Sequence, residues 1–242
     1  MVFVIAETAD EALHLKATFG ERAIFGGGLT ALQLGWASGM PGAPVIDVSR
    51  IDFGPIVSAL PTGGLRLAAN ARLEALRRDR MVAERLPALC DLLAQVGASG
   101  VRNLATIAGN LAWGTGDTEV LLAALEADYL LAGGARFPVG KRLPTGGLVE
   151  AVEVRDVGAG DVFAEKVGHR ASFSSSKLVV AGARCEGGWN IAVRLGAIPI
   201  IICKLSGDVP ATSSVFAGSD RRLARVAANL IAGHVRRLGA VA

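Results

Sequence analysis

The chain has 242 residues, of which 51% are hydrophobic and 19% are charged, and its formal net charge is +3. A charge this small, with no basic stripe interleaved with aromatic residues, argues against a nucleic-acid-binding protein. The length suffices for one large domain or two smaller ones around a buried core. The high apolar content indicates either surface that partner subunits bury or an alanine-rich composition.

No apolar run predicts a membrane span. The stretch 195–205 is the most apolar, but it contains Pro199 and falls well short of the roughly 20 residues that a spanning helix needs. The N-terminus lacks a basic region followed by a long apolar one, so we expect a cytoplasmic chain without a secretory signal. The three cysteines are widely spaced, which argues against disulfides and against zinc or iron–sulfur ligation. We therefore expect no metal site on this chain.

The beginning of the chain alternates strand and helix patterns. Thr8, with Glu11 three residues later, has the spacing of a capping box at a helix start. A run of three glycines, Gly26-Gly27-Gly28, follows a short apolar stretch and precedes a helical one. The expected elements are strands at 2–5, 23–25 and 45–48, and helices at 8–19 and 29–37.

The middle of the chain mixes helices and short strands. A polar loop is expected at 102–110, between two apolar helical segments. The other expected elements are a strand at 65–69, helices at 72–78, 81–96 and 118–126, and short strands with turns from 129 to 154.

The segment 156–161, Asp-Val-Gly-Ala-Gly-Asp, predicts a boundary, after which strand patterns dominate. The last stretch, 220–238, has apolar residues at helical spacing with five arginines between them, which predicts an amphipathic helix. The strands expected between these two segments are 162–167, 178–183, 189–195 and 198–204.

Two loops have the composition of phosphate-binding sites. The segment 101–110 combines a cation, two carboxamides, a hydroxyl and a glycine, and the other loop is the triple glycine at 26–28. Backbone N–H groups and short polar side chains in such loops bind anions. Two separate loops of this kind indicate a large nucleotide cofactor.

The first loop alone also fits a different cofactor. Gly26-x-Gly28-x-x-Ala31 after a strand imitates the Rossmann fingerprint, and Asp47, about 20 residues later, supplies the acid for a ribose hydroxyl. Against a Rossmann domain, no regular βαβ series continues beyond residue 50 or so, and the second loop would have no role. A glycine-rich connector without a ligand is a further alternative.

The second loop resembles that of one family. Arg102-Asn103-x-Ala-Thr-Ile-x-Gly-Asn110, followed by Asp117 and the leucine-rich run 121–125, resembles the FAD-binding subunit of the molybdenum hydroxylases. This family includes xanthine dehydrogenase, carbon monoxide dehydrogenase and aldehyde oxidoreductase. Further segments that resemble the family, in the same order along the chain, are 26–32, 45–51, 64–69 and 163–170.

The resemblance implies an α+β fold with a two-subdomain, PCMH-type FAD-binding domain at 1–158, divided near residue 52, and a smaller sheet-plus-helix C-terminal domain at 159–242. It implies an oxidoreductase subunit that takes electrons from a 2Fe–2S subunit and passes them to a final acceptor. Nothing in the chain resembles iron–sulfur or molybdopterin modules, so both cofactors are expected on partner subunits. Because the cofactor carries the redox chemistry, no catalytic side chain is expected.

The resemblance also implies the cofactor contacts. Gly27 and Gly28 would let backbone amides approach the FAD pyrophosphate, because glycine has no Cβ. Asp117 would accept a hydrogen bond from the ribose or adenine side, and Lys166 would lie near the flavin. The full expected set is Gly26, Gly27, Gly28, Leu29, Thr30, Ala105, Thr106, Gly109, Asn110, Asp117 and Lys166.

Several of these residues have an alternative structural role. Thr106 and Asn110 are also suited to capping the following helix, and Lys166 to lying on a strand in solvent. Arg102 is expected to anchor its loop through a salt bridge. The family usually has Thr-Asp-Leu where this chain has residues 29–31, and a glycine where it has Ala108. These departures leave open a non-catalytic scaffold subunit that has lost the flavin.

Overall fold

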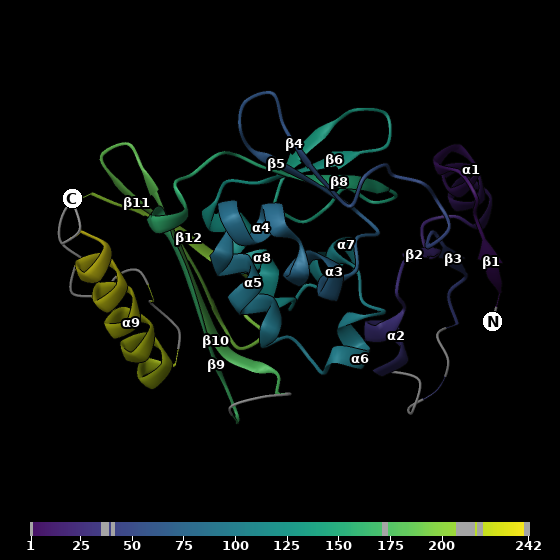
Figure 1. Ribbon diagram of the computed structural model, residues 1–242. Helices are drawn as coiled ribbons and strands as arrows, with labels where there is room; N and C mark the ends of the chain where they lie inside the picture. The colour runs from purple at the N-terminus through teal and green to yellow at the C-terminus, as the bar shows by residue number, and fades with distance from the viewer. Residues whose placement is uncertain are drawn as a thin grey trace.

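The structure is a computed structural model that describes residues 2–34, 39, 42–170, 174–206, 216 and 220–239. Within these residues the strands form sheets of three, five and four strands. Figure 1 shows the three-stranded sheet near the N-terminus at one end of the molecule and the four-stranded sheet with helix α9 at the other. The five-stranded sheet and a group of helices lie between them. The expected α+β class is confirmed.

The three-stranded sheet is parallel, with β3 in the centre. Its central strand is fully buried at Ile46, whereas the edge strand β1 is largely exposed. Thr8 caps α1 as expected, because its Oγ1 accepts a hydrogen bond from the Glu11 N–H at 3.1 Å. The elements are β1 (Phe3–Ile5), α1 (Ala9–Phe19), β2 (Ile24–Gly26), α2 (Thr30–Leu34) and β3 (Val45–Asp47). Residues 35–37 of the helix expected at 29–37 lie outside the described residues.

Six helices follow, and two expectations for this region were wrong. The helix expected at 81–96 is interrupted, since Leu86 has φ −141° and ψ 57° and Pro87 starts a new helix. Proline lacks the N–H that would continue the first helix and is well suited to the first position of the next. The segment 102–110 is also more helical than the expected loop. The helices are α3 (Leu73–Arg78), α4 (Arg80–Arg85), α5 (Pro87–Ala94), α6 (Ser99–Arg102), α7 (Ile107–Ala112) and α8 (Asp117–Ala124).

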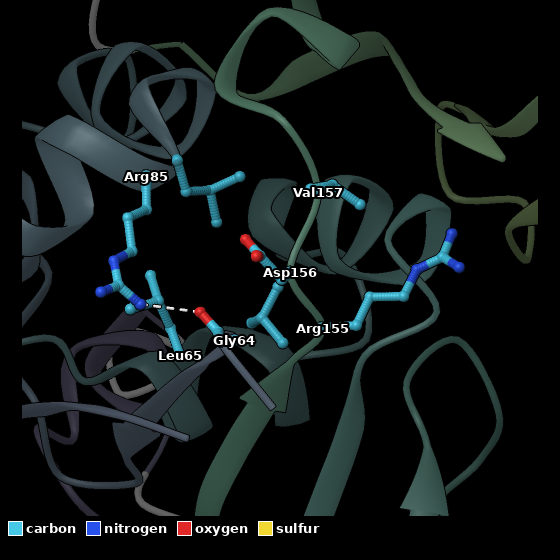
Figure 2. Close-up of a pocket in the computed structure, with 9 residues that line it drawn as sticks. Gly64, Leu65, Arg85, Arg155, Asp156 and Val157 are labelled. Atoms are coloured by element: carbon cyan, nitrogen blue, oxygen red, sulfur yellow. Dashed lines mark hydrogen bonds between the residues drawn. The ribbon is translucent and has the colours of Figure 1, made fainter. Parts of the chain in front are cut away.

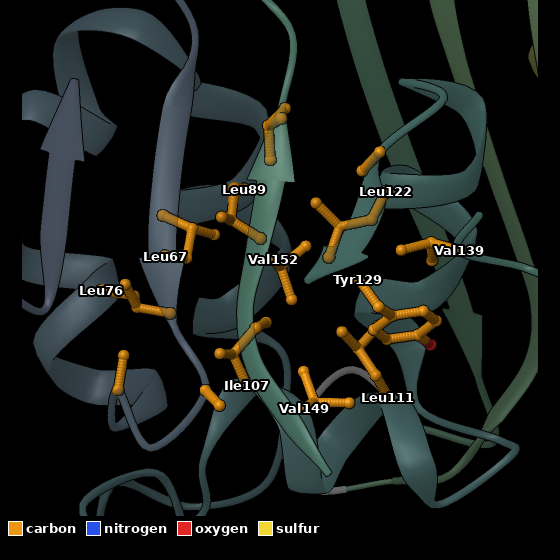
Figure 3. Packing of buried hydrophobic residues seen from close by; sticks show 14 of the residues in the cluster. Leu67, Leu76, Leu89, Ile107, Leu111, Leu122, Tyr129, Val139, Val149 and Val152 are labelled. Atoms are coloured by element: carbon orange, nitrogen blue, oxygen red, sulfur yellow. The ribbon is translucent and has the colours of Figure 1, made fainter. Parts of the chain in front are cut away.

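The five-stranded sheet is antiparallel and covers these helices in the order β4-β5-β8-β6-β7. Figure 3 shows Leu67 and Val152 of the sheet among Leu76, Leu89 and Leu122 of the helices, in the largest hydrophobic core. Strand β4 was not predicted. The strands are β4 (Val57–Ala59), β5 (Leu65–Ala68), β6 (Asp128–Leu131), β7 (Arg136–Pro138) and β8 (Val149–Val154).

The four-stranded sheet is antiparallel, and both of its faces are buried. One face, which includes Val179 and Ala181, belongs to the same core as the helices. The other face, with Val180 and Ile191, forms a second core with α9, whose Ile231 is 3% exposed. The elements are η2 (Ala159–Asp161), β9 (Val162–Gly168), β10 (Ser176–Cys185), β11 (Gly188–Leu195), β12 (Ile201–Leu205) and α9 (Arg221–Gly239). Among the described residues, none of the helices is both long and apolar enough to span a membrane.

Candidate cofactor site

The two glycine-containing loops meet, although about 75 residues separate them in the sequence. A Cβ on Gly28 would lie 1.9 Å from the Leu104 carbonyl oxygen, and one on Gly27 would lie 2.8 Å from Thr106 Oγ1. Real Cβ atoms do not approach other atoms this closely, so both positions require glycine in this packing. The backbone of the first loop therefore lies directly against the segment 104–106, which connects α6 to α7. Figure 1 shows α2, the helix that follows the first loop, beside α6.

The first loop has backbone donors that nothing else uses. Within the described part of the chain, the N–H groups of residues 27–30 make no hydrogen bond to another group. Leu29 has φ 57°, in the left-handed region, between the glycines and the start of α2 at Thr30. Successive N–H groups in such a turn form an anion-binding concavity. Gly26 ends β2 and is buried below this turn. These features fit a phosphate group of a nucleotide.

Thr106 organises the second loop. Its hydroxyl accepts a hydrogen bond from the Gly109 N–H at 3.1 Å and so caps α7. The next two N–H groups, of Ile107 and Ala108, donate to the carbonyls of Ala71 and Ala69 just after β5. The buried Ala105 accepts from the Leu73 N–H at 2.9 Å, which completes the attachment to α3. The second loop is thus held rigidly by the five-stranded sheet and the helices.

Asn110 links the second loop to α8. Its Oδ1 accepts hydrogen bonds from the hydroxyl of Thr118 at 2.6 Å and from the Thr118 N–H at 3.4 Å. The alternative role expected for Thr106 and Asn110, capping of the following helix, is therefore confirmed for both side-chain oxygens. Thr106 caps α7, and Asn110 accepts hydrogen bonds at the start of α8. The Nδ2 donor of Asn110 makes no hydrogen bond within the described residues and stays available to a ligand.

Asp117 and Lys166 contact each other. Lys166 Nζ lies 2.6 Å from Asp117 Oδ2 and also donates to the Gln95 carbonyl at 3.0 Å. Only 6% of the Lys166 side chain is exposed, so the alternative of a solvated strand lysine was wrong. The structure thus joins α8 to β9 through a buried ion pair that contains two of the expected site residues.

Arg102 anchors the second loop through the expected salt bridge. Its Nε lies 2.6 Å from Glu74 Oε2, and its Nη1 donates to the Gly97 carbonyl at 2.9 Å. Glu74 is 3% exposed and also binds Arg77 and Arg78. The hydrogen bonds from Arg77 and Arg102 hold the pKa of the Glu74 carboxyl far below its usual range, although burial opposes this shift. Sequence analysis did not identify Glu74, although its spacing to Arg77 and Arg78 on one helix was visible.

Comparison with known families identifies the family of the chain. Residues 1–162 match the family described as the FAD binding domain in molybdopterin dehydrogenase. The chain belongs to this family. The match covers both loops. The chain is therefore an FAD-binding subunit of the molybdenum hydroxylase type and an oxidoreductase component.

Solved structures of molybdenum hydroxylases have the same fold. Reconstituted CO dehydrogenase from Oligotropha carboxidovorans aligns with a TM-score of 0.83 at 19% identity, over 100% of this chain and 98% of that chain. Quinoline 2-oxidoreductase from Pseudomonas putida 86 aligns with a TM-score of 0.78 at 17% identity, over 98% and 97%. Carbon monoxide dehydrogenase from Hydrogenophaga pseudoflava aligns with a TM-score of 0.78 at 20% identity, over 98% and 95%. No curated protein matches the chain by sequence.

The family assignment replaces the Rossmann alternative. Within the described residues the parallel sheet has only three strands, and the rest of the pairing is antiparallel. Asp47, which the alternative assigned to a ribose, accepts a hydrogen bond from the Ser49 N–H at 2.8 Å instead. Its carboxylate thus closes a local turn.

A second buried charged residue, near the expected site residue Asp117, was not predicted from the sequence. Arg194 on β11 is 2% exposed, donates to the Gly116 carbonyl at 2.7 Å and pairs with Glu119. Burial raises the pKa of the Glu119 carboxyl, although Arg194 opposes this shift. The only visible sign of this residue was a single arginine inside a mostly apolar strand.

A separate shallow pocket contains none of the expected site residues. Figure 2 shows Arg85 on one side and Asp156 on the other, with the Gly64 turn below them. Arg85 donates to the Gly63 carbonyl at 2.7 Å, so its guanidinium is already engaged.

Proposed function

We propose that this chain holds FAD across the two loops and passes electrons from a 2Fe–2S partner subunit to a final acceptor. Substrate oxidation would take place on a separate molybdopterin subunit. The assignment to the FAD-binding family supports the cofactor, and the fold shared with CO dehydrogenase and quinoline 2-oxidoreductase supports the type of complex. FAD supplies the redox chemistry when bound, and the chain supplies binding and electrostatics.

One observation carries this proposal, namely the direct contact of Gly27 and Gly28 with the segment 104–106. This contact places the N–H groups of residues 27–30 close enough to the second loop for one ligand to contact both loops. In the proposed complex Gly26, Gly27, Gly28, Leu29 and Thr30 hold one side of the pyrophosphate. The other side of the pyrophosphate and the adjoining ribose contact Ala105, Thr106, Gly109 and Asn110.

We further propose that the Asp117–Lys166 pair lies at the edge of the bound cofactor. Its 2.6 Å contact is buried, and the Oδ1 atom of Asp117 makes no hydrogen bond within the described part of the chain, which leaves an acceptor for a ligand hydroxyl. The Lys166 side chain is 6% exposed, so its ammonium group lies in a region from which most water is excluded. Such a charge stabilises an anionic reduced flavin more strongly than it would in water.

We propose the boundary between the FAD-binding domain (1–158, with subdomains near 1–52 and 53–158) and the C-terminal domain (159–242) just before η2. The family match ends at residue 162, close to this point. Because one face of the four-stranded sheet shares the main core, we expect the C-terminal part to unfold together with the helices rather than separately.

A scaffold that has lost the flavin is the second candidate. Its support is that the side chains of Thr106, Asp117 and Lys166 already satisfy one another or a helix end. The two candidates differ in one measurement. The purified chain is supplied with FAD, desalted and examined by visible spectroscopy. Flavin bands at about 375 and 450 nm support the first candidate if the 450 nm band loses intensity when the 2Fe–2S partner and an electron source are added, because the flavin is then reduced. A colourless chain that still assembles with its partners supports the scaffold.

A further inference from the structure

Arg194 is a buried cation whose partners all lie on one turn of one helix. Its side chain is 2% exposed and projects from β11 on the face opposite to that of its neighbours Val193 and Leu195. Removing a guanidinium from water costs several kcal/mol unless hydrogen bonds and an opposite charge compensate. Both compensating groups, the Gly116 carbonyl and the Glu119 carboxylate, belong to the start of α8.

A second cation from the same sheet reaches the same turn. Val179 of β10 pairs in register with Arg194 on β11 and with Lys166 on β9. Residues in register across neighbouring strands point to the same face of a sheet. Lys166 and Arg194 therefore flank Val179 on the face that meets α8, and they bind Asp117 and Glu119. Figure 1 shows β9 and β10 alongside α8.

This turn of α8 is packed against the second loop. A Cβ on Gly116 would lie 1.9 Å from the Asn110 carbonyl oxygen. Two residues later, Thr118 donates to Asn110 Oδ1 through both its hydroxyl and its N–H. A displacement of Gly116 or Thr118 would therefore move Asn110, and Asn110 lies in the same loop as Thr106 and Gly109.

We infer that Arg194 is a positioning residue for the FAD site. It holds the start of α8 against the four-stranded sheet and thereby fixes Asn110 and Asp117 in the orientation that binds the cofactor. This inference rests on the proposed function for the identity of the ligand, but not for the ordering of the loop. The two hydrogen-bonding partners of Arg194 within the described residues, Gly116 and Glu119, are not among the expected cofactor contacts.

The test compares variants of the full chain. Arg194→Met removes the charge but keeps much of the volume, and Arg194→Lys keeps the charge. Arg194→Met combined with Glu119→Gln also removes the carboxylate that would otherwise stay buried and unpaired, which protects the fold. Arg184→Met is the matched control. Arg184 lies on the same sheet and its Nε contacts Asp161 at 2.5 Å, outside α8.

Two readouts separate the inference from the proposed function. The first is the dissociation constant for FAD, measured by quenching of flavin fluorescence. The second is amide hydrogen exchange in the segment 104–118 without FAD. The double variant should bind FAD about tenfold more weakly, as expected for the loss of about one hydrogen bond to the ligand. It should also exchange faster in this segment. Arg194→Lys should restore most of both properties, and Arg184→Met should change neither.

The outcomes are distinct. Unchanged exchange in the segment 104–118 of the double variant would overturn the inference. Faster exchange with an unchanged FAD affinity would also overturn it, because Arg194 would then order a loop without affecting the site. If the wild-type chain binds no FAD, the proposed function is refuted. Faster exchange in the double variant would still support the role of Arg194 in ordering the loop.

Discussion

Replacement of Glu74 by alanine should destabilise the chain far more than an ordinary surface substitution. Glu74 is 3% exposed, and its partner Arg102 has a side chain that is 10% exposed. Removal of one member of a buried ion pair typically costs about 3–5 kcal/mol, because the other charge stays buried without compensation. The remaining partners, Arg77 and Arg78, are more exposed and regain water. We expect a loss of about 3 kcal/mol in the free energy of unfolding.

Urea unfolding monitored by circular dichroism measures this loss. Glu84→Ala is the matched control, because Glu84 pairs with Arg80 at 2.7 Å on a helix but its partner is 91% exposed. Exposed pairs of this kind contribute within about 0.5 kcal/mol. A second replacement, Arg102→Met, in the Glu74→Ala background should recover part of the loss. If Glu74→Ala were no more destabilising than Glu84→Ala, the burial argument would be refuted.

Three further predictions address the loops and their anchor. Gly28→Ala should weaken FAD binding at least about tenfold and destabilise the fold by about 1–3 kcal/mol, because its Cβ would meet the Leu104 carbonyl. Gly100→Ala, where a Cβ meets nothing within 4 Å, is the control in both assays. Asn110→Ala should lower flavin retention after desalting by an amount that corresponds to about 1.5–3 kcal/mol; full retention would limit Asn110 to capping α8. The folded-state pKa of Glu74 lies below its usual 4.5, so its contribution to stability is complete above pH 4.5 and falls as the pH drops further. Denaturant midpoints measured between neutral pH and pH 3 should therefore decline less steeply in Glu74→Gln than in the wild type, and parallel curves would count against this linkage.

Local patterns in the sequence were sufficient for most elements. Alternating or continuous apolar runs located the strands around Ile46 and Val180, because strand burial leaves a pattern within a few residues. The Thr8 cap was found for the same reason, since its hydrogen bond spans three residues. The loops themselves were recognised by composition and by resemblance to the family, and their meeting was the expected consequence of a shared ligand.

The interruption of the expected 81–96 helix at Pro87 has a local cause, whereas the other errors arose where long-range contacts decide the structure. Segment 102–110 was expected as a loop, but Thr106 caps a short helix there and the sheet carbonyls of Ala69 and Ala71 hold its first N–H groups. The pairing of Lys166 with Asp117 across 49 residues of sequence was not predicted, whereas their contact with the cofactor stays a prediction. Arg194 contacts Gly116 from 78 residues away, and no local pattern encodes such a partner.

The structure of the chain with FAD bound tests the central claim most directly. The account predicts that the diphosphate lies against the backbone N–H groups of Gly27 and Gly28 on one side and against Gly109 and Asn110 on the other. A diphosphate bound to only one of these loops, or at the pocket beside Arg85, would contradict it.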